Sequence, residues 1–192
     1  MPSIPLKGYP KEIVTKDGTP ILIRPLAKED EHRLQEFFAS FAEEEVWFFR
    51  ADVQDPVVLH TWIEELDFER MTPLLAVKPD SDTVVAMLRL YRRPAGCMRH
   101  IGHIRILVHP AYRQQRVGTW MLLDLVKLAM DMGIEKLVAE FVAGVEEAGI
   151  NGADRLDFFQ QAVLKDYVRD PRGGYRDLVI MVKNLHREWG DF

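Results

Sequence analysis

Cysteine is nearly absent from this chain of 192 residues, in which Cys97 stands alone. A lone cysteine excludes an internal disulfide, so we expect the reducing environment of the cytoplasm. Long apolar runs are missing too: the opening MPSIPLKGYPKE has no apolar core of signal-peptide length, and no other run approaches the ~18 residues of a membrane span. We expect no membrane partner. The absence of repeats and Gly/Ser-rich linkers predicts one domain over residues 1–192.

A net positive charge is also lacking. The chain has 25 Lys and Arg against 30 Asp and Glu, and this net charge of −5 argues against a nucleic-acid partner. The charge is unevenly distributed, because residues 27–70 carry 13 acids and 4 bases whereas residues 89–116 carry seven arginines and no acid. Two solvated faces of opposite sign explain this pattern as well as a binding site does. Whether residues 89–116 lie at a binding site decides between these two explanations.

Several catalytic signatures are absent. The sequence contains no G-x-x-x-x-G-K-[ST] phosphate loop, no H-E-x-x-H and no spacing typical of a Ser-His-Asp triad. Cys97, His100 and His103 form C-x2-H-x2-H, which suggests zinc. A structural zinc site needs four converging ligands, and three side chains that alternate along a turn and a strand do not converge. We therefore expect no metal.

What the sequence does contain is a regular succession of apolar patterns. They predict strands at about 21–26, 72–77, 83–91, 101–108, 136–142, 159–168 and 175–182, and helices at about 31–41, 55–66, 117–132 and 146–156. Strands come in runs with few helices among them, which favours an α+β fold over a regular βαβ barrel.

The most informative stretch is I-R-I-L-V-H-P-A-Y-R-Q-Q-R-V-G-T at residues 104–119. A strand ends at Val108, a polar loop follows, and a helix begins at about Val117. A helix N-terminus offers unpaired backbone N–H groups and the positive end of the helix dipole. We predict that Arg105, Arg113 and Arg116 converge there on an anionic phosphate ligand. An ordinary strand-to-helix connection is the alternative that these residues leave open.

The same residues, V-H-P-A-Y-R-Q-Q-R-V-G-T-W-M-L-L, resemble the acetyl-coenzyme A signature of the GNAT acetyltransferase superfamily, bacterial type, whose loop reads [RQ]-x-x-G-x-[GA]. Arg113 fits the first position and Gly118 the last, whereas Arg116 stands where the family usually has glycine. I-R-P-L-A-K-E-D-E-H at residues 23–32 is similar to the opening strand and helix of these enzymes. The start Y-P-K-E-I…D-G-T…I-R-P is similar to the acetyltransferase portion of some bacterial protein-lysine acetyltransferases.

The resemblance implies a single-domain α+β fold with a mixed, mostly antiparallel twisted sheet flanked by helices. It places the core of this domain at about residues 20–185 and leaves an N-terminal extension at 1–19. It implies acetyl-CoA as co-substrate, with the pantetheine near Leu107 and Val108. The pyrophosphate is expected on the loop and first helical turn, formed with Arg113 by Gln114, Gln115, Arg116, Val117, Gly118 and Thr119. A negative φ at Arg116 would let its guanidinium reach a phosphate, whereas a positive φ would strain the arginine and weaken binding.

The implied reaction is direct transfer of an acetyl group to a primary amine of a small molecule, a protein lysine or a protein N-terminus. Proton removal from the amine needs a base with a pKa near the working pH, which favours histidine. His103 and His100 both lie on the strand that enters the site, on opposite faces if that strand is regular. We predict His103 as the base, with a half-exposed strand histidine of no catalytic role as the alternative.

The acid is less well specified. Where family members often carry an aromatic residue, a glycine and a coenzyme-contacting asparagine, this chain has Ala153, Asp157 and Glu146. Tyr167 in K-D-Y-V is our candidate for protonating the thiolate or lining the acceptor site, with water as the alternative acid. These departures leave a second hypothesis open, a non-catalytic acyl-CoA-binding or interaction module. Homodimer formation is also left open.

The resemblance implies that the first two helices form part of the mouth of the acceptor site. Trp47, Phe48 and Phe49 follow Glu43-Glu44-Glu45, whose negative charge would attract a cationic amine. A solvated acidic helix end with aromatic side chains packed beneath it is the alternative.

Overall fold

The computed structural model describes residues 6, 8–49 and 51–185. Its strands are hydrogen-bonded in the order β1-β2-β3-β4-β5-β6-β8-β7. Where β5 meets β6 the strands run parallel, whereas β1, β2 and β3 pair antiparallel, as do β6, β8 and β7. The predicted α+β architecture is confirmed. The chain forms two compact units, one with the residues up to Arg89 and Ile106–Leu123, the other with Leu90–Arg105 and the residues from Asp124 onward.

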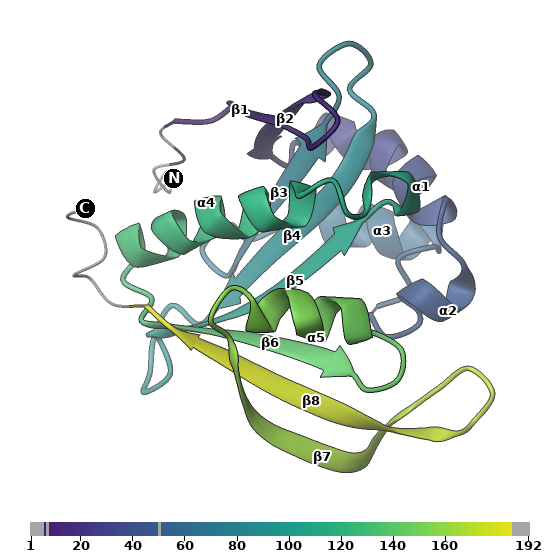
Figure 1. Ribbon diagram of the computed structural model, residues 1–192. Coiled ribbons are helices and arrows are strands. Elements are labelled where there is room, and N and C mark those ends of the chain that lie inside the picture. The colour runs from purple at the N-terminus through teal and green to yellow at the C-terminus, as the bar shows by residue number, and fades with distance from the viewer. Residues whose placement is uncertain (1–5, 7, 50, 186–192) are drawn as a thin grey trace. The chain divides into compact units, whose positions relative to one another are not determined.

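The first unit contains β1 (Lys11–Val14), β2 (Pro20–Pro25), β3 (Met71–Val77) and most of β4 (Val84–Arg92). The sequence places the first strand at Ile21 and misses β1, which lies beside β2 (Figure 1). Every second residue of this four-residue strand is exposed, so it carries no apolar run. Part of the predicted N-terminal extension is therefore an ordered sheet edge.

Helices α1 (Glu31–Ala39), α2 (Glu43–Val46) and α3 (Pro56–Glu64) belong to the same unit. Asp55 caps α3 as expected, because its carboxylate accepts a hydrogen bond from the Val57 N–H (2.8 Å) ahead of Pro56. The apolar faces of these helices form one core with β3 and β4. Its members include Leu34, Phe37, Phe38, Phe41, Leu59, Ile63, Leu75, Val77 and Met87.

Asp30 is buried at the N-terminus of α1, with 1% of its surface exposed. Its carboxylate accepts hydrogen bonds from Arg24 (2.6 and 2.7 Å), the Ala27 N–H (2.9 Å) and Arg33 (3.2 Å). Burial raises the pKa of Asp30, but the hydrogen bonds from Arg24 and Ala27 and the two positive charges outweigh it. The pKa of Asp30 therefore lies below its ordinary value.

The Asp30→Asn variant is expected to lower the free energy of unfolding by about 3 kcal/mol, because two arginines lose their buried counter-ion. Thermal unfolding should then occur about 6–12 °C lower. Asp82→Asn is the matched control, since Asp82 pairs with Arg33 at 3.3 Å with half of its side chain exposed. Since the pKa of Asp30 is lowered, its contribution is complete above about pH 4 and is lost as the pH falls through that pKa. Equal losses in the two variants would contradict this interpretation.

The second unit contains the start of β5 (Ile101–Val108), together with β6 (Lys136–Val142), α5 (Glu147–Asp154) and the hairpin of β7 (Phe159–Arg169) and β8 (Tyr175–Asn184) (Figure 1). The long helix α4 (Val117–Asp131) begins in the first unit and ends in the second. As its periodicity predicts, α4 buries Val117, Met121, Leu122, Leu125, Leu128 and Ala129. It ends before Gly133, whose φ of +75° suits glycine after a helix.

Candidate cofactor and catalytic sites

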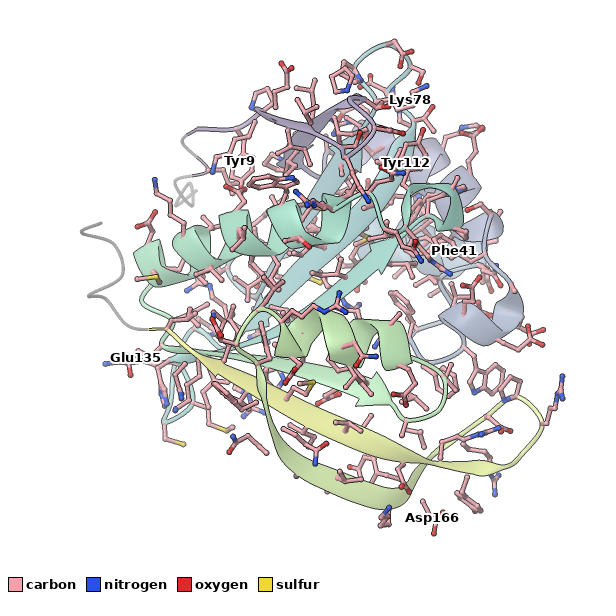
Figure 2. All side chains as sticks on the ribbon, viewed as in Figure 1. Tyr9, Phe41, Lys78, Tyr112, Glu135 and Asp166 are labelled. Carbon is pink, nitrogen blue, oxygen red and sulfur yellow. The ribbon has the colours of Figure 1, made fainter. Side chains whose placement is uncertain are left out.

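His109, the residue that follows β5, is fixed by hydrogen bonds and ring contacts within the first unit. The His109 N–H donates to the Val85 oxygen of β4 (2.9 Å), and the His109 ring accepts a hydrogen bond from the Ala111 N–H (3.2 Å). The rings of Phe41 and Tyr112, both labelled in Figure 2, contact the His109 ring edge to face. The turn Pro110–Tyr112 follows, and the chain then enters the loop before α4. The loop therefore starts from a fixed strand end.

The loop before α4 has an unusual backbone. Gln114 has a φ of +62° and Arg116 a φ of +66°, although neither residue is glycine. The Gln115 oxygen accepts a hydrogen bond from the Lys16 N–H (3.2 Å), which ties the loop to the turn after β1. The Arg116 oxygen accepts from the Trp120 N–H (3.0 Å) and so begins the helical ladder. The N–H groups of Val117, Gly118 and Thr119 consequently have no acceptor within the helix.

Gly118 has no side chain that could cover the N–H groups in the first turn of α4. A Cβ atom built on Gly118 would lie 3.4 Å from Val108 Cγ2 and 3.8 Å from Ile106 Cγ2, which is ordinary contact, so the protein itself tolerates alanine there. Among the described residues, the side-chain oxygen of Gln115 is buried without a hydrogen-bond partner. Exposed N–H groups at a helix N-terminus suit an anion. The loop therefore fits the pyrophosphate of a coenzyme A thioester.

The three arginines predicted to converge on the loop have different roles. Arg113 donates to Glu45 of α2 (2.6 Å) and to the Val108 oxygen (3.2 Å). Arg105, which belongs to the second unit, donates to Glu146 (2.6 Å). Arg116 is exposed, and among the described residues its side chain has no hydrogen bond or ion pair. Arg116 is thus the loop arginine without an ion pair, and its φ of +66° is the case for which the sequence predicts backbone strain and weaker cofactor binding.

Relieving the backbone strain at Arg116 should stabilise the protein. A non-glycine residue in the left-handed region costs about 1–2 kcal/mol, part of which is offset by the greater freedom of glycine in the unfolded chain. The Arg116→Gly variant is therefore expected to unfold about 2–4 °C higher than wild type in the absence of ligand. Arg116→Ala keeps the positive φ and loses only the guanidinium, so no gain is expected. An equal gain in both variants would assign the effect to charge.

The backbone groups of β5 alternate between its two edges. The His109 N–H points to β4, and the His100 oxygen accepts from the Lys136 N–H (3.2 Å) of β6. By this alternation the Leu107 backbone faces β4 and its side chain packs on the core of the first unit. Ile106 and Val108 present their N–H and C=O groups at the other edge. Ile106 is a candidate for pairing with an extended ligand that the sequence did not single out.

A small apolar pocket lies in the first unit, on the predicted acceptor side. It is lined by Phe38, Phe49, Val53, Trp62, Met87 and Arg89, among others. Phe49 packs edge to face on Phe38, and the Arg89 guanidinium lies over the Phe49 ring (5.3 Å). Leu107 and Phe49 contact the same core cluster. The aromatic side chain of Phe49 is therefore part of a packed cluster, whereas Trp47 has 45% of its surface exposed.

The predicted catalytic residues belong to the second unit. His103 lies on β5 opposite Val138 of β6 and is half-buried. It faces away from Gly102, where a Cβ atom would come within 2.6 Å of Leu90. His100 lies in the turn before β5, so the prediction that both histidines lie on the strand is wrong for His100. Tyr167 has 64% of its surface exposed, next to Asp166, at the irregularity of β7 between Leu164 and Val168.

The three departures from the family pattern differ in effect. Asp157 has a φ of +60°, so aspartate, which tolerates this region, keeps the conformation typical of glycine. Ala153 is buried at 7% exposure and brings no proton donor. Glu146 stands immediately before α5 and accepts hydrogen bonds from Arg105 and from the Val142 N–H (2.8 Å).

In residues 6, 8–49 and 51–185, no group of three or more His, Cys, Asp or Glu could hold a metal ion. Over the same residues no helix is long and apolar enough to cross a membrane.

Comparison with known proteins identifies the family. Residues 31–158 match the acetyltransferase (GNAT) family. The search of curated proteins gives no significant match. Among solved structures, ribosomal-protein-S5-alanine acetyltransferase from Vibrio fischeri is 11% identical with a TM-score of 0.75, covering 91% of this chain and 98% of that one. The protein yncA from Salmonella typhimurium, solved with its cofactor acetyl-CoA, is 20% identical with a TM-score of 0.71, covering 87% and 95%. The GNAT domain of S. lividans PAT is 20% identical with a TM-score of 0.71, covering 91% and 96%.

Proposed function

Because the chain belongs to the acetyltransferase (GNAT) family, we propose that it is an N-acetyltransferase that passes the acetyl group of acetyl-CoA directly to a primary amine. The observation that carries this proposal is the N-terminus of α4, where the N–H groups of Val117, Gly118 and Thr119 have no helical acceptor. Arg113, Gln114, Gln115 and Arg116 complete the phosphate loop. Leu107 and Val108 lie on the strand proposed to hold the pantetheine, joined by Ile106.

The proposed chemistry follows from the thioester. The neutral amine attacks the carbonyl carbon, the C–S bond breaks, and the amine proton passes to His103. A neutral imidazole can accept that proton. A thiol has an ordinary pKa of about 8.5, so the leaving thiolate needs only weak assistance. Water or Tyr167 supplies its proton, and the exposure of Tyr167 leaves it accessible to solvent.

The proposed acceptor is a small-molecule amine, a protein lysine or a protein N-terminus. The apolar pocket beside Trp62 and Phe49 would take its apolar part. One of the acids expected to attract the amine, Glu45, is paired with Arg113, so less negative charge is available than the sequence suggests. The proposed compartment is the cytoplasm, in agreement with the free and exposed Cys97.

A non-catalytic acyl-CoA-binding module is the second candidate, favoured by the buried Ala153 at the expected position of the acid. Release of free thiol from acetyl-CoA across a panel of primary amines and lysine peptides separates the two functions. An acetyltransferase releases thiol only when an acceptor is present. Saturable binding of acetyl-CoA in calorimetry, with no amine-dependent thiol release, would favour the module.

A further inference from the structure

The pairing of β5 with β6 stops before either strand ends. Paired residues run from Ile101 opposite Lys136 to Ile104 opposite Ala139. Strand β6 continues to Val142, and β5 continues through Arg105. The Ala143 N–H, which directly follows β6, donates to the Asp177 oxygen of β8 (3.0 Å), whereas the Lys136 N–H points to the β5 side. By alternation, the backbone groups of Glu140 and Val142 point to the β5 side as well.

Two side chains are hydrogen-bonded to these backbone groups. The Glu140 oxygen accepts a hydrogen bond from Arg105 Nη1 (3.0 Å), and the Val142 N–H donates to Glu146 Oε2 (2.8 Å). The Val142 oxygen accepts from the Glu146 N–H (2.9 Å) in the turn to α5. Arg105 and Glu146 are joined to each other at 2.6 and 3.2 Å. An ion pair thus takes the place that a neighbouring strand would take.

This ion pair is well shielded. The side chains of Arg105 and Glu146 are 17% and 22% exposed, so water screens their attraction less than it screens a surface pair. Hydrogen bonds with a charged partner are stronger than neutral ones. The backbone groups at the end of β6 are therefore held by charge-assisted hydrogen bonds, which are stronger than hydrogen bonds between neutral groups.

An extended ligand with amide groups binds a strand end through backbone N–H and C=O groups. The pantetheine arm of acetyl-CoA is such a ligand. We propose that the Arg105–Glu146 pair is a latch that competes with this arm for the end of β6, so that tight binding of acetyl-CoA requires the pair to open. The proposal rests on the proposed function, and it adds that Arg105 and Glu146 set the affinity for acetyl-CoA.

The Glu146→Gln variant tests the latch. Glutamine keeps the shape of the side chain and can still accept from Val142, but it loses the charge that holds Arg105. We expect acetyl-CoA to bind about 5- to 30-fold more tightly, the difference between a charged and a neutral hydrogen bond. Isothermal titration calorimetry on the full chain measures the change.

Glu147→Gln is the matched control. Glu147 accepts from the Gly144 N–H at 2.8 Å in the same turn and does not bond to Arg105. Its replacement removes one negative charge from the same neighbourhood, so it corrects for simple repulsion of the coenzyme phosphates. S-acetylpantetheine, which has the amide arm and no phosphate, is the second probe. The latch predicts a gain with Glu146→Gln for both ligands and no gain with Glu147→Gln.

Three results would overturn the latch. Equal dissociation constants in wild type and Glu146→Gln would show that the pair does not compete with the arm. Equal gains in Glu146→Gln and Glu147→Gln would assign the effect to overall charge. If wild type and both variants fail to bind acetyl-CoA, the proposed function fails together with the latch. Circular dichroism and thermal unfolding confirm that each variant is folded, and the double variant Arg105→Gln/Glu146→Gln, which removes both charges, should retain the gain.

Discussion

The Gly118→Val variant should bind acetyl-CoA about 30- to 100-fold more weakly than wild type. Gly118 lies in the first turn of α4, where backbone N–H groups without a helical acceptor form the proposed phosphate site. The valine side chain adds three carbons beside these donors and holds the pyrophosphate away. The expected loss corresponds to one or two charge-assisted hydrogen bonds of about 1.5–3 kcal/mol each.

Gly118→Ala separates this effect from damage to the fold. An added Cβ atom meets only Val108 and Ile106, at 3.4 and 3.8 Å, so the helix tolerates the methyl group. We expect alanine to keep affinity within a few fold of wild type, in line with its place in the family pattern. Calorimetric titration with acetyl-CoA measures all three proteins. Undiminished affinity in Gly118→Val would contradict the assignment of the loop.

The His103→Ala variant should lower kcat about 100-fold and leave the dissociation constant of acetyl-CoA nearly unchanged. A positioned general base contributes about 10²- to 10⁴-fold to rate, and its removal does not touch the phosphate site. The wild-type rate should rise as the pH is raised, because only the neutral ring accepts a proton. That rise should vanish in the variant.

His100→Ala is the control for this experiment. The backbone oxygen of His100 accepts hydrogen bonds from Glu135 and Lys136, and these survive the substitution. Its side chain starts from the turn before β5 rather than from the strand. We expect kcat close to wild type. A His103→Ala protein with the wild-type pH profile would exclude His103 as the base.

Much of the fold could be predicted from the sequence because most elements are long and periodic. The strands Ile101–Val108 and Lys136–Val142 have their predicted bounds, and α4 begins where the loop motif ends. The short elements β1 and α2 were missed, since four residues with exposed positions carry too little apolar pattern. Helix α3 was expected to reach Leu66 but ends at Glu64.

The electrostatics of the site could not be predicted from local spacing. Arg113 pairs with Glu45, 68 positions away, and Arg105 with Glu146, 41 positions away. Spacing along a helix or strand identifies partners a few residues apart, whereas these pairs depend on how distant segments fold together. The arginine-rich stretch therefore looks like one positive field in the sequence. In the structure Arg105 and Arg113 are paired with acids, and Arg116, held at a positive φ, is the exposed loop arginine that has no ion pair among the described residues.

The most direct test of the account is the initial rate of thiol release, measured while acetyl-CoA and a primary amine are varied together. Direct transfer requires both substrates to be bound at once, so the double-reciprocal lines should intersect and the acceptor should gain one acetyl group. Parallel lines with an acetylated protein chain would indicate a covalent intermediate. That result, or thiol release that does not depend on the amine, would contradict direct acetyl transfer at this site.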